Sequence, residues 1–217
     1  MTNFRPLEKP IGIIGGTFDP IHFGHLRTAM ELLQIFDLEK IHFVPCHSPV
    51  HKGDPLASAA HRLAMLHLAV ANEPRLVPDD REIARDTPSY MIDTLQSFRK
   101  AHPDRPLALI VGSDAFINLA TWKNWRHLIE LAHIIVAIRA GQKMLLDTEM
   151  ENFLNAHHDL DYGASHEELA GKIFLQFVTP LDISSTMIRC QVGAHYSPEF
   201  LLPDSVLAYI KTHQLYE

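Results

Sequence analysis

Cysteine is nearly absent from this chain of 217 residues, which carries only Cys46 and Cys190. The two lie far apart and form no CxxC pair, so the pattern argues against a disulfide framework and a zinc knuckle and predicts two reduced thiols. The chain also lacks a run of about 18 apolar residues, which a membrane-spanning helix needs, and a basic N-terminal stretch leading into an apolar signal core. The sequence therefore predicts a soluble, cytoplasmic protein without a membrane partner.

An excess of positive charge is missing too. The chain has 19 Lys and Arg against 26 Asp and Glu, a formal net charge of −7. That balance argues against a nucleic-acid partner, which a basic surface would attract. A P-loop (GxxxxGKS/T), a nucleophile elbow (GxSxG) and a zinc-protease motif (HExxH) are absent. The 15 histidines match no metal-ligand spacing, so we expect most of them on the surface and no metal held by protein ligands.

Short apolar runs alternate with helical patterns along the chain. Strands are predicted at 11–14, 41–44, 107–111, 134–138 and 173–178, and helices at roughly 24–36, 58–72, 90–101, 144–157 and 199–212. This alternation is typical of an α/β fold, a Rossmann-like doubly wound parallel sheet with helices on both faces. The length and the 47% hydrophobic content predict a single domain over residues 1–217, or a domain with a small appendage.

The most informative segment reads GGTFDPIHFGH and follows the first predicted strand. A strand that ends in a glycine turn and opens a helix collects backbone N–H groups and a positive helix end, where phosphate can bind. Gly15 and Gly16 let an oxyanion approach the main chain. His22 and His25 can bind a phosphoryl oxygen and, when protonated, offset charge that develops on it. Alternatively, the turn packs tightly and the histidines have no chemical role.

A second motif reads ISSTMIR and occupies residues 183–189. Ser184 or Asp182 can cap a new helix, whose first N–H groups, at Ser185 and Thr186, form a second anion cradle. Arg189 shares a helix face with both hydroxyls and can hold phosphate oxygens through two donors. Taken alone, the pattern fits a capped helix with a surface arginine better.

The two motifs together resemble those of bacterial adenylyltransferases. Further short motifs lie at 44–45, 49–52, 62–66, 82–85, 88–90, 93–95, 112–114, 122–125, 139–141, 202–203, 206–210 and 215–216. With these, essentially the whole chain is similar to the bacterial nicotinate-nucleotide adenylyltransferases of the HxGH nucleotidyltransferase superfamily. The resemblance implies adenylyl transfer from ATP to nicotinate mononucleotide, giving deamido-NAD and pyrophosphate by direct in-line attack, with Mg²⁺ carried by ATP. Alternatives are transfer to nicotinamide mononucleotide or phosphopantetheine, and a non-catalytic ATP-sensing module.

The resemblance also implies roles for individual residues. The catalytic residues would be His22, His25 and Arg189. The ATP site would contain Gly15, Gly16, Thr17, Phe18, Lys52, Ile183, Ser184, Ser185 and Thr186. A C-terminal helical part of the single domain, about 180–217, would complete this site. The nicotinate-nucleotide site would contain His51, Ser89, Tyr90, Met91, Gly112, Asp114 and Trp122.

Some of these assignments have alternatives. Met91 stands where many relatives have threonine, which matters only if that hydroxyl helps to bind the nicotinate carboxylate. Asp114 would bind a ribose or cap a short helix. Trp122 would stack on the pyridine ring, although Trp122 and Trp125, three residues apart, also fit core packing. Lys52 would reach the phosphates or stay solvated in its loop.

Overall fold

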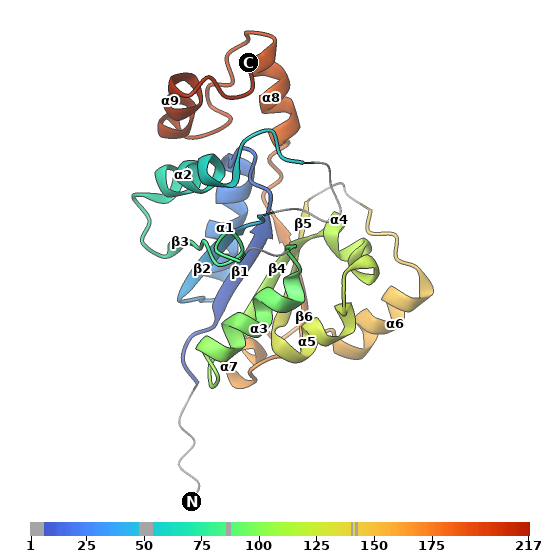
Figure 1. Cartoon of the computed structure of the whole chain (residues 1–217). Helices are drawn as coiled ribbons and strands as arrows, with labels where there is room; N and C mark the ends of the chain where they lie inside the picture. Colours follow the sequence, from blue (N-terminus) through green and yellow to red (C-terminus); the bar gives the residue numbers. More distant parts are fainter. Residues whose placement is uncertain (1–6, 48–53, 86–87, 140, 142) are drawn as a thin grey trace, which may run out of the picture.

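The computed structural model describes residues 7–47, 54–85, 88–139, 141 and 143–217. The parallel strands are β1 (Ile11–Gly16), β2 (Lys40–Pro45), β3 (Leu76–Pro78), β4 (Leu107–Gly112), β5 (His133–Arg139) and β6 (Ile173–Val178). They form one sheet in the order β3-β2-β1-β4-β5-β6 (Figure 1). Because the chain winds outward in one direction from β1 and in the other from β4, the predicted doubly wound fold is confirmed.

Helices cover both faces of the sheet. They are α1 (Phe23–Ile35), α2 (Ala59–Val70), α3 (Met91–Ala101), α4 (Ser113–Ile117), α5 (Leu128–Leu131), α6 (Thr148–His157), α7 (Ala164–Glu167), α8 (Ser185–Gly193) and α9 (Asp204–Thr212). Successive side chains of a strand point to opposite faces, so each strand serves two cores. Ala108 and Ile110 of β4 join the core under α1, α2, α8 and α9. Leu107, Leu109 and Val111 join the core under α3, α4, α5 and α6.

One strand of the sheet was not predicted: β3, which pairs with β2 at the edge of the sheet. This strand has only three residues and ends in Pro78. So short a segment shows no apolar periodicity, and proline is tolerated in a sheet mainly at an edge. Its existence depends on pairing with β2, which local sequence does not report.

Two helices begin later than their predicted bounds. The one predicted from residue 144 begins at Thr148, because the Asp147 side chain accepts a hydrogen bond from Met150 N at 2.8 Å and caps it there. The one predicted from residue 199 begins at Asp204, directly after Pro203. Both starts follow local signals, an N-cap aspartate and a proline, that outweigh the apolar pattern preceding them.

Most of the histidines in the described part of the chain lie at least partly at the surface, as predicted, and those that are buried are His22, His42 and His133. The most exposed are His67, His127, His158, His195 and His213. His133 is fully buried, and its ring bonds Glu168 O at 2.9 Å and Lys172 N at 3.2 Å, because it joins β5 to the segment leading into β6. Both cysteines are free, as predicted. Among the described helices, none is long and apolar enough to cross a membrane.

Candidate active site

A cleft of about 1170 Å³ opens at the carboxyl ends of β1 and β4, where the strand order reverses. The predicted residues that line it are Gly15, Gly16, Thr17, Phe18, His22, His25, Ser89, Tyr90, Met91, Gly112, Asp114, Trp122, Ile183, Ser184, Ser185, Thr186 and Arg189. His51 and Lys52 lie outside the described residues. The structure thus gathers segments from both ends of the chain at the position where doubly wound sheets bind ligands.

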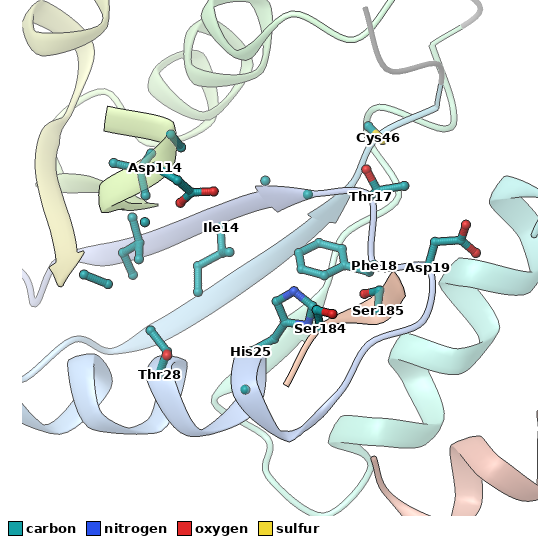
Figure 2. Close-up of a pocket in the computed structure, with 18 of the residues that line it drawn as sticks. Ile14, Thr17, Phe18, Asp19, His25, Thr28, Cys46, Asp114, Ser184 and Ser185 are labelled. Atoms are coloured by element: carbon teal, nitrogen blue, oxygen red, sulfur yellow. The ribbon is translucent and has the colours of Figure 1, made fainter. Parts of the chain in front are cut away.

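The turn after β1 forms one wall of the cleft (Figure 2). A Cβ on Gly15 would lie 2.3 Å from the Met91 methyl group, so any larger residue would push that methyl aside. A Cβ on Gly16 would lie 2.9 Å from the ring of Phe18. Phe18 has a left-handed backbone (φ 50°), is 3% exposed and places its ring edge-on to His25. Glycine at these two positions therefore leaves room for the side chains of Met91 and Phe18 and also leaves the backbone uncovered.

His22 and His25 stack on each other, with ring centroids 3.7 Å apart. His22 is the N-cap of α1 rather than part of its first turn, and its side chain is buried. A Cβ on Gly24 would lie 3.0 Å from the His22 ring, so glycine leaves room for that ring. His22 Nδ1 is buried and finds no hydrogen-bond partner among the described residues. It is a polar group that a ligand could satisfy.

The second motif meets the first across the cleft. Ser184 caps α8, since its Oγ accepts a hydrogen bond from Met187 N at 3.1 Å, which decides between Ser184 and Asp182 as the cap. Ser185 Oγ donates to Pro20 O at 2.9 Å.

Arg189 completes this contact between the motifs. It donates from Nη1 to Asp19 O at 2.7 Å and from Nη2 to Thr186 Oγ1 at 3.3 Å. The predicted grouping of Arg189 with both hydroxyls is half right, because the Ser185 hydroxyl binds the β1 turn instead. Figure 2 shows Ser184 and Ser185 next to Phe18 and His25.

The opposite end of the cleft is built around the start of α3. Ser89 Oγ accepts a hydrogen bond from His47 N at 2.9 Å, which ties the segment before α3 to the end of β2. Tyr90 is the N-cap of α3, and Lys123 Nζ lies 4.3 Å from the centroid of its ring. Met91 is half-buried and lies against Gly15. This end therefore offers aromatic surface, a cation and a helix N-terminus.

The tryptophans have different surroundings. Trp125 is buried and packs against Phe153 with ring centroids 4.8 Å apart, whereas Trp122 is half-buried and lines the cleft. Trp125 is therefore a core residue, whereas Trp122 packs against the same core and also lines the cleft. Asp114 is exposed in the first turn of α4, whose N-cap is Gly112, so the capping alternative for Asp114 is wrong.

Known proteins resemble this chain both in sequence and in fold. The sequence profile of the cytidylyltransferase-like family matches residues 13–191. A protein of Aeromonas salmonicida named "Probable nicotinate-nucleotide adenylyltransferase" is 43% identical over 211 residues, which cover 97% of this chain and 99% of that protein. The chain belongs to the nicotinate-nucleotide adenylyltransferase family. A family member from Hahella chejuensis is 44% identical, with 96% of each chain covered.

Solved structures support the fold of the family. The nicotinic acid mononucleotide adenylyltransferase of Plasmodium falciparum, complexed with NaAD, superposes with a TM-score of 0.74 at 19% identity, and covers 96% of this chain and 98% of its own. At such low identity the likeness concerns the arrangement of the chain.

The sequence predicts no role for Arg62, a cationic residue of the motif at 62–66 that ties together the segments around the cleft. Arg62 is 1% exposed, and its guanidinium donates to the carbonyl groups of four residues. The acceptors are Ala57 O (3.2 Å), Thr17 O (2.8 Å), Cys46 O (2.6 Å) and His47 O (3.3 Å). An arginine on the buried face of α2, three residues before Met65 and four before Leu66, was the available signal.

A second residue that sequence reasoning missed is Asp19. It is 4% exposed, and its carboxylate accepts hydrogen bonds from Leu56 N, Ala57 N and Tyr216 Oη. Because three donors occupy its carboxylate, Asp19 stabilises the conformation of the turn after β1. Among the described residues, no group of three or more His, Cys, Asp or Glu is arranged to hold a metal ion.

Burial, and then the positive charge of Arg139, lowers the pKa of His22 to about 4. The imidazole of the ligand-free protein is therefore neutral at pH 7. A neutral imidazole still donates one hydrogen bond. His22 would therefore act on a phosphoryl oxygen as a hydrogen-bond donor and not, as the sequence also allowed, as a positive charge.

The lowered pKa of His22 makes stability depend on pH. Above pH 6.5 the residue is neutral in both states; below it the unfolded chain binds a proton that the folded chain does not, so stability falls until about pH 4. Between pH 7 and pH 4.5, we expect the free energy of unfolding to fall by on the order of 2–3 kcal/mol less in His22→Gln than in the wild type. Urea unfolding at pH 7 and pH 4.5 measures it, with His67→Gln, at an exposed site, as the control. Parallel pH dependences for wild type and His22→Gln would contradict the prediction.

Proposed function

We propose that this protein transfers the adenylyl group of ATP to nicotinate mononucleotide and releases pyrophosphate and deamido-NAD. The observation that carries the proposal is the convergence of the two phosphate-type motifs at the switch point of the sheet, in a chain that matches nicotinate-nucleotide adenylyltransferases over nearly its whole length. The related Plasmodium falciparum enzyme is described in complexes with NaAD and with APC. The same pair of sites would serve this chain.

In the proposed reaction, the 5′-phosphate of the mononucleotide attacks the α-phosphorus of ATP in line as the bond to pyrophosphate breaks. The N–H groups of the turn at 15–18 and of the start of α8 would hold the triphosphate, with the residues from about 180 onward completing the ATP site. His22, His25 and Arg189 would donate hydrogen bonds to the oxygens on which charge develops. At the other end, Asp114 would bind a ribose and Trp122 would stack on the pyridine ring.

A protein nucleophile is not part of this mechanism. Cys46 lines the cleft, but burial raises the pKa of its thiol above the usual value, so it stays protonated. Catalysis then rests on positioning and charge neutralisation.

Mg²⁺ would arrive with ATP, held by phosphate oxygens and water, and would neutralise phosphate charge. The described part of the site fits that arrangement, because it contains no cluster of metal ligands and the Asp19 carboxylate is occupied by three donors.

The experiment incubates purified protein with Mg²⁺–ATP and, separately, nicotinate mononucleotide, nicotinamide mononucleotide and phosphopantetheine. Pyrophosphate release and the dinucleotide product are measured. Release with nicotinate mononucleotide supports the proposal. Release only with another acceptor, or ATP binding without release, overturns it in favour of a related transferase or an ATP sensor.

We expect the acid to be preferred over the amide. The carboxylate would accept hydrogen bonds from main-chain N–H groups after Tyr90 and beside Trp122, whereas a carboxamide would present its own N–H groups to these donors. We expect kcat/KM to favour nicotinate mononucleotide by more than about 100-fold. If only the backbone of Met91 takes part, Met91→Thr keeps this ratio; equal kcat/KM values in the wild type would contradict the expectation.

A further inference from the structure

The last residues of the chain reach the turn that carries the two histidines. Tyr216 donates a hydrogen bond from Oη to Asp19 Oδ1 at 2.6 Å, across 197 positions of sequence. After α9 the chain folds back, with Leu215 N bonded to Ile210 O at 3.1 Å. A Cβ on Gly193 of α8 would lie 3.2 Å from Tyr216 O. The C-terminal tail thus lies against α8, as Figure 1 shows.

The tail contacts the candidate site through the carboxylate of Asp19. Its Oδ2 accepts from Leu56 N at 2.9 Å, and its Oδ1 accepts from Ala57 N at 3.2 Å as well as from Tyr216. Its carbonyl oxygen accepts from Arg189 Nη1 at 2.7 Å. A buried carboxylate needs all its donors, because each missing hydrogen bond leaves charge uncompensated. The position of Asp19, and with it the carbonyl that orients Arg189, therefore depends on Tyr216.

Tyr216 is itself held in an unusual conformation. Its φ is 69°, in the left-handed region that side-chain-bearing residues rarely adopt, and its ring packs against the core under α8 and α9. Burial, and then the hydrogen bond to Asp19, raises the pKa of its hydroxyl above the usual range. The hydroxyl therefore remains a donor.

We propose that Tyr216 is a positioning residue for the ATP end of the cleft, which fixes the turn at 15–22 relative to Arg189 by holding the Asp19 carboxylate. The inference rests on the proposed function, since it assigns a role within the same site. The tail after α9 would then contribute to nucleotide binding, although Tyr216 itself contacts no substrate.

The test compares Tyr216→Phe with Tyr209→Phe. Tyr209 is the matched control, because its hydroxyl is also bound to a partly buried side chain, His61 Nδ1 at 2.9 Å, but away from the cleft. Titration with Mg²⁺–ATP alone should show affinity about 10-fold weaker for Tyr216→Phe, and near wild type for Tyr209→Phe. In turnover, KM for ATP should rise and KM for nicotinate mononucleotide should stay unchanged. A merely structural role would lower the active fraction without this split between the two KM values.

A double variant tests the route through Asp19. If Tyr216 acts through that carboxylate, Tyr216→Phe should add little to the loss of ATP affinity caused by Asp19→Asn. Wild-type ATP affinity in Tyr216→Phe, equal losses in Tyr216→Phe and Tyr209→Phe, or fully additive losses with Asp19→Asn would each overturn the proposal. A wild-type protein that binds ATP but adenylylates no nicotinate mononucleotide would refute the proposed function instead, and the ATP titrations would still decide the role of Tyr216.

Discussion

Replacing His22 with alanine should lower kcat for pyrophosphate release by about 10²–10³-fold, the usual effect of losing one donor to a developing oxyanion. His22 is buried, its pKa is lowered to about 4, and its Nδ1 has no partner among the described residues, so the neutral ring is free to donate to a bound phosphate. His25→Ala should have a similar effect, because the two rings stack at 3.7 Å. ATP affinity should change far less than kcat, since the donor acts mainly in the transition state.

Steady-state kinetics and a separate titration with Mg²⁺–ATP measure the two effects. His67→Ala, at an exposed position on α2, is the control and should retain wild-type turnover. Unchanged kcat in both His22→Ala and His25→Ala would show that the motif only packs, and would remove the proposed chemistry from this end of the cleft.

Arg62→Met should destabilise the protein by about 3 kcal/mol or more, a fall in Tm of roughly 6–12 °C. The substitution keeps most of the apolar volume but leaves buried carbonyl groups of three separate segments, at Thr17, Cys46–His47 and Ala57, without their donor. Arg62→Lys should recover little, because an ammonium group cannot reproduce the planar fork that reaches all of them. Urea unfolding gives the free energy directly.

Arg27→Met is the control for this change. Arg27 lies on α1 with its side chain 56% exposed and forms an i,i+4 ion pair with Glu31, so its loss should leave Tm near the wild-type value. An Arg62→Met protein as stable as Arg27→Met would mean that the buried guanidinium does not stabilise the fold. If instead Arg62→Met folds but loses ATP affinity, the bond to Thr17 O also supports the nucleotide turn.

Local patterns predicted the fold where elements are long. The predicted strands at 107–111 and 134–138 are buried apolar runs, and the apolar pattern is enough to find such segments. β3 was not predicted, because a three-residue edge strand forms only by pairing with the neighbouring strand. The late starts of α6 and α9 show that caps and prolines set helix bounds more strongly than apolar spacing.

The candidate site was predictable to the extent that its residues sit in contiguous motifs. The segments at 15–25 and 183–189 each carry a turn, a cap and charged or polar side chains, and the structure brings them together at one cleft. The roles of Arg62, Asp19 and Tyr216 were not predicted, although all three lie in the quoted motifs, because these roles depend on contacts between distant parts of the chain, such as the hydrogen bond between Tyr216 and Asp19. The pKa of His22 also depends on burial, which the motif alone does not reveal.

The buried guanidinium of Arg62 has a consequence for how this protein can tolerate substitution. Its close partners are carbonyl oxygens of the main chain, which every amino acid possesses, and the one side chain it contacts among the described residues is Cys46, with Sγ at 3.9 Å. As far as this network is concerned, the side chains at Thr17, His47 and Ala57 can change freely, while position 62 cannot. Saturation mutagenesis with selection for folded protein should therefore recover arginine alone at position 62. At position 47 it should recover several residue types, because the network does not use the His47 side chain.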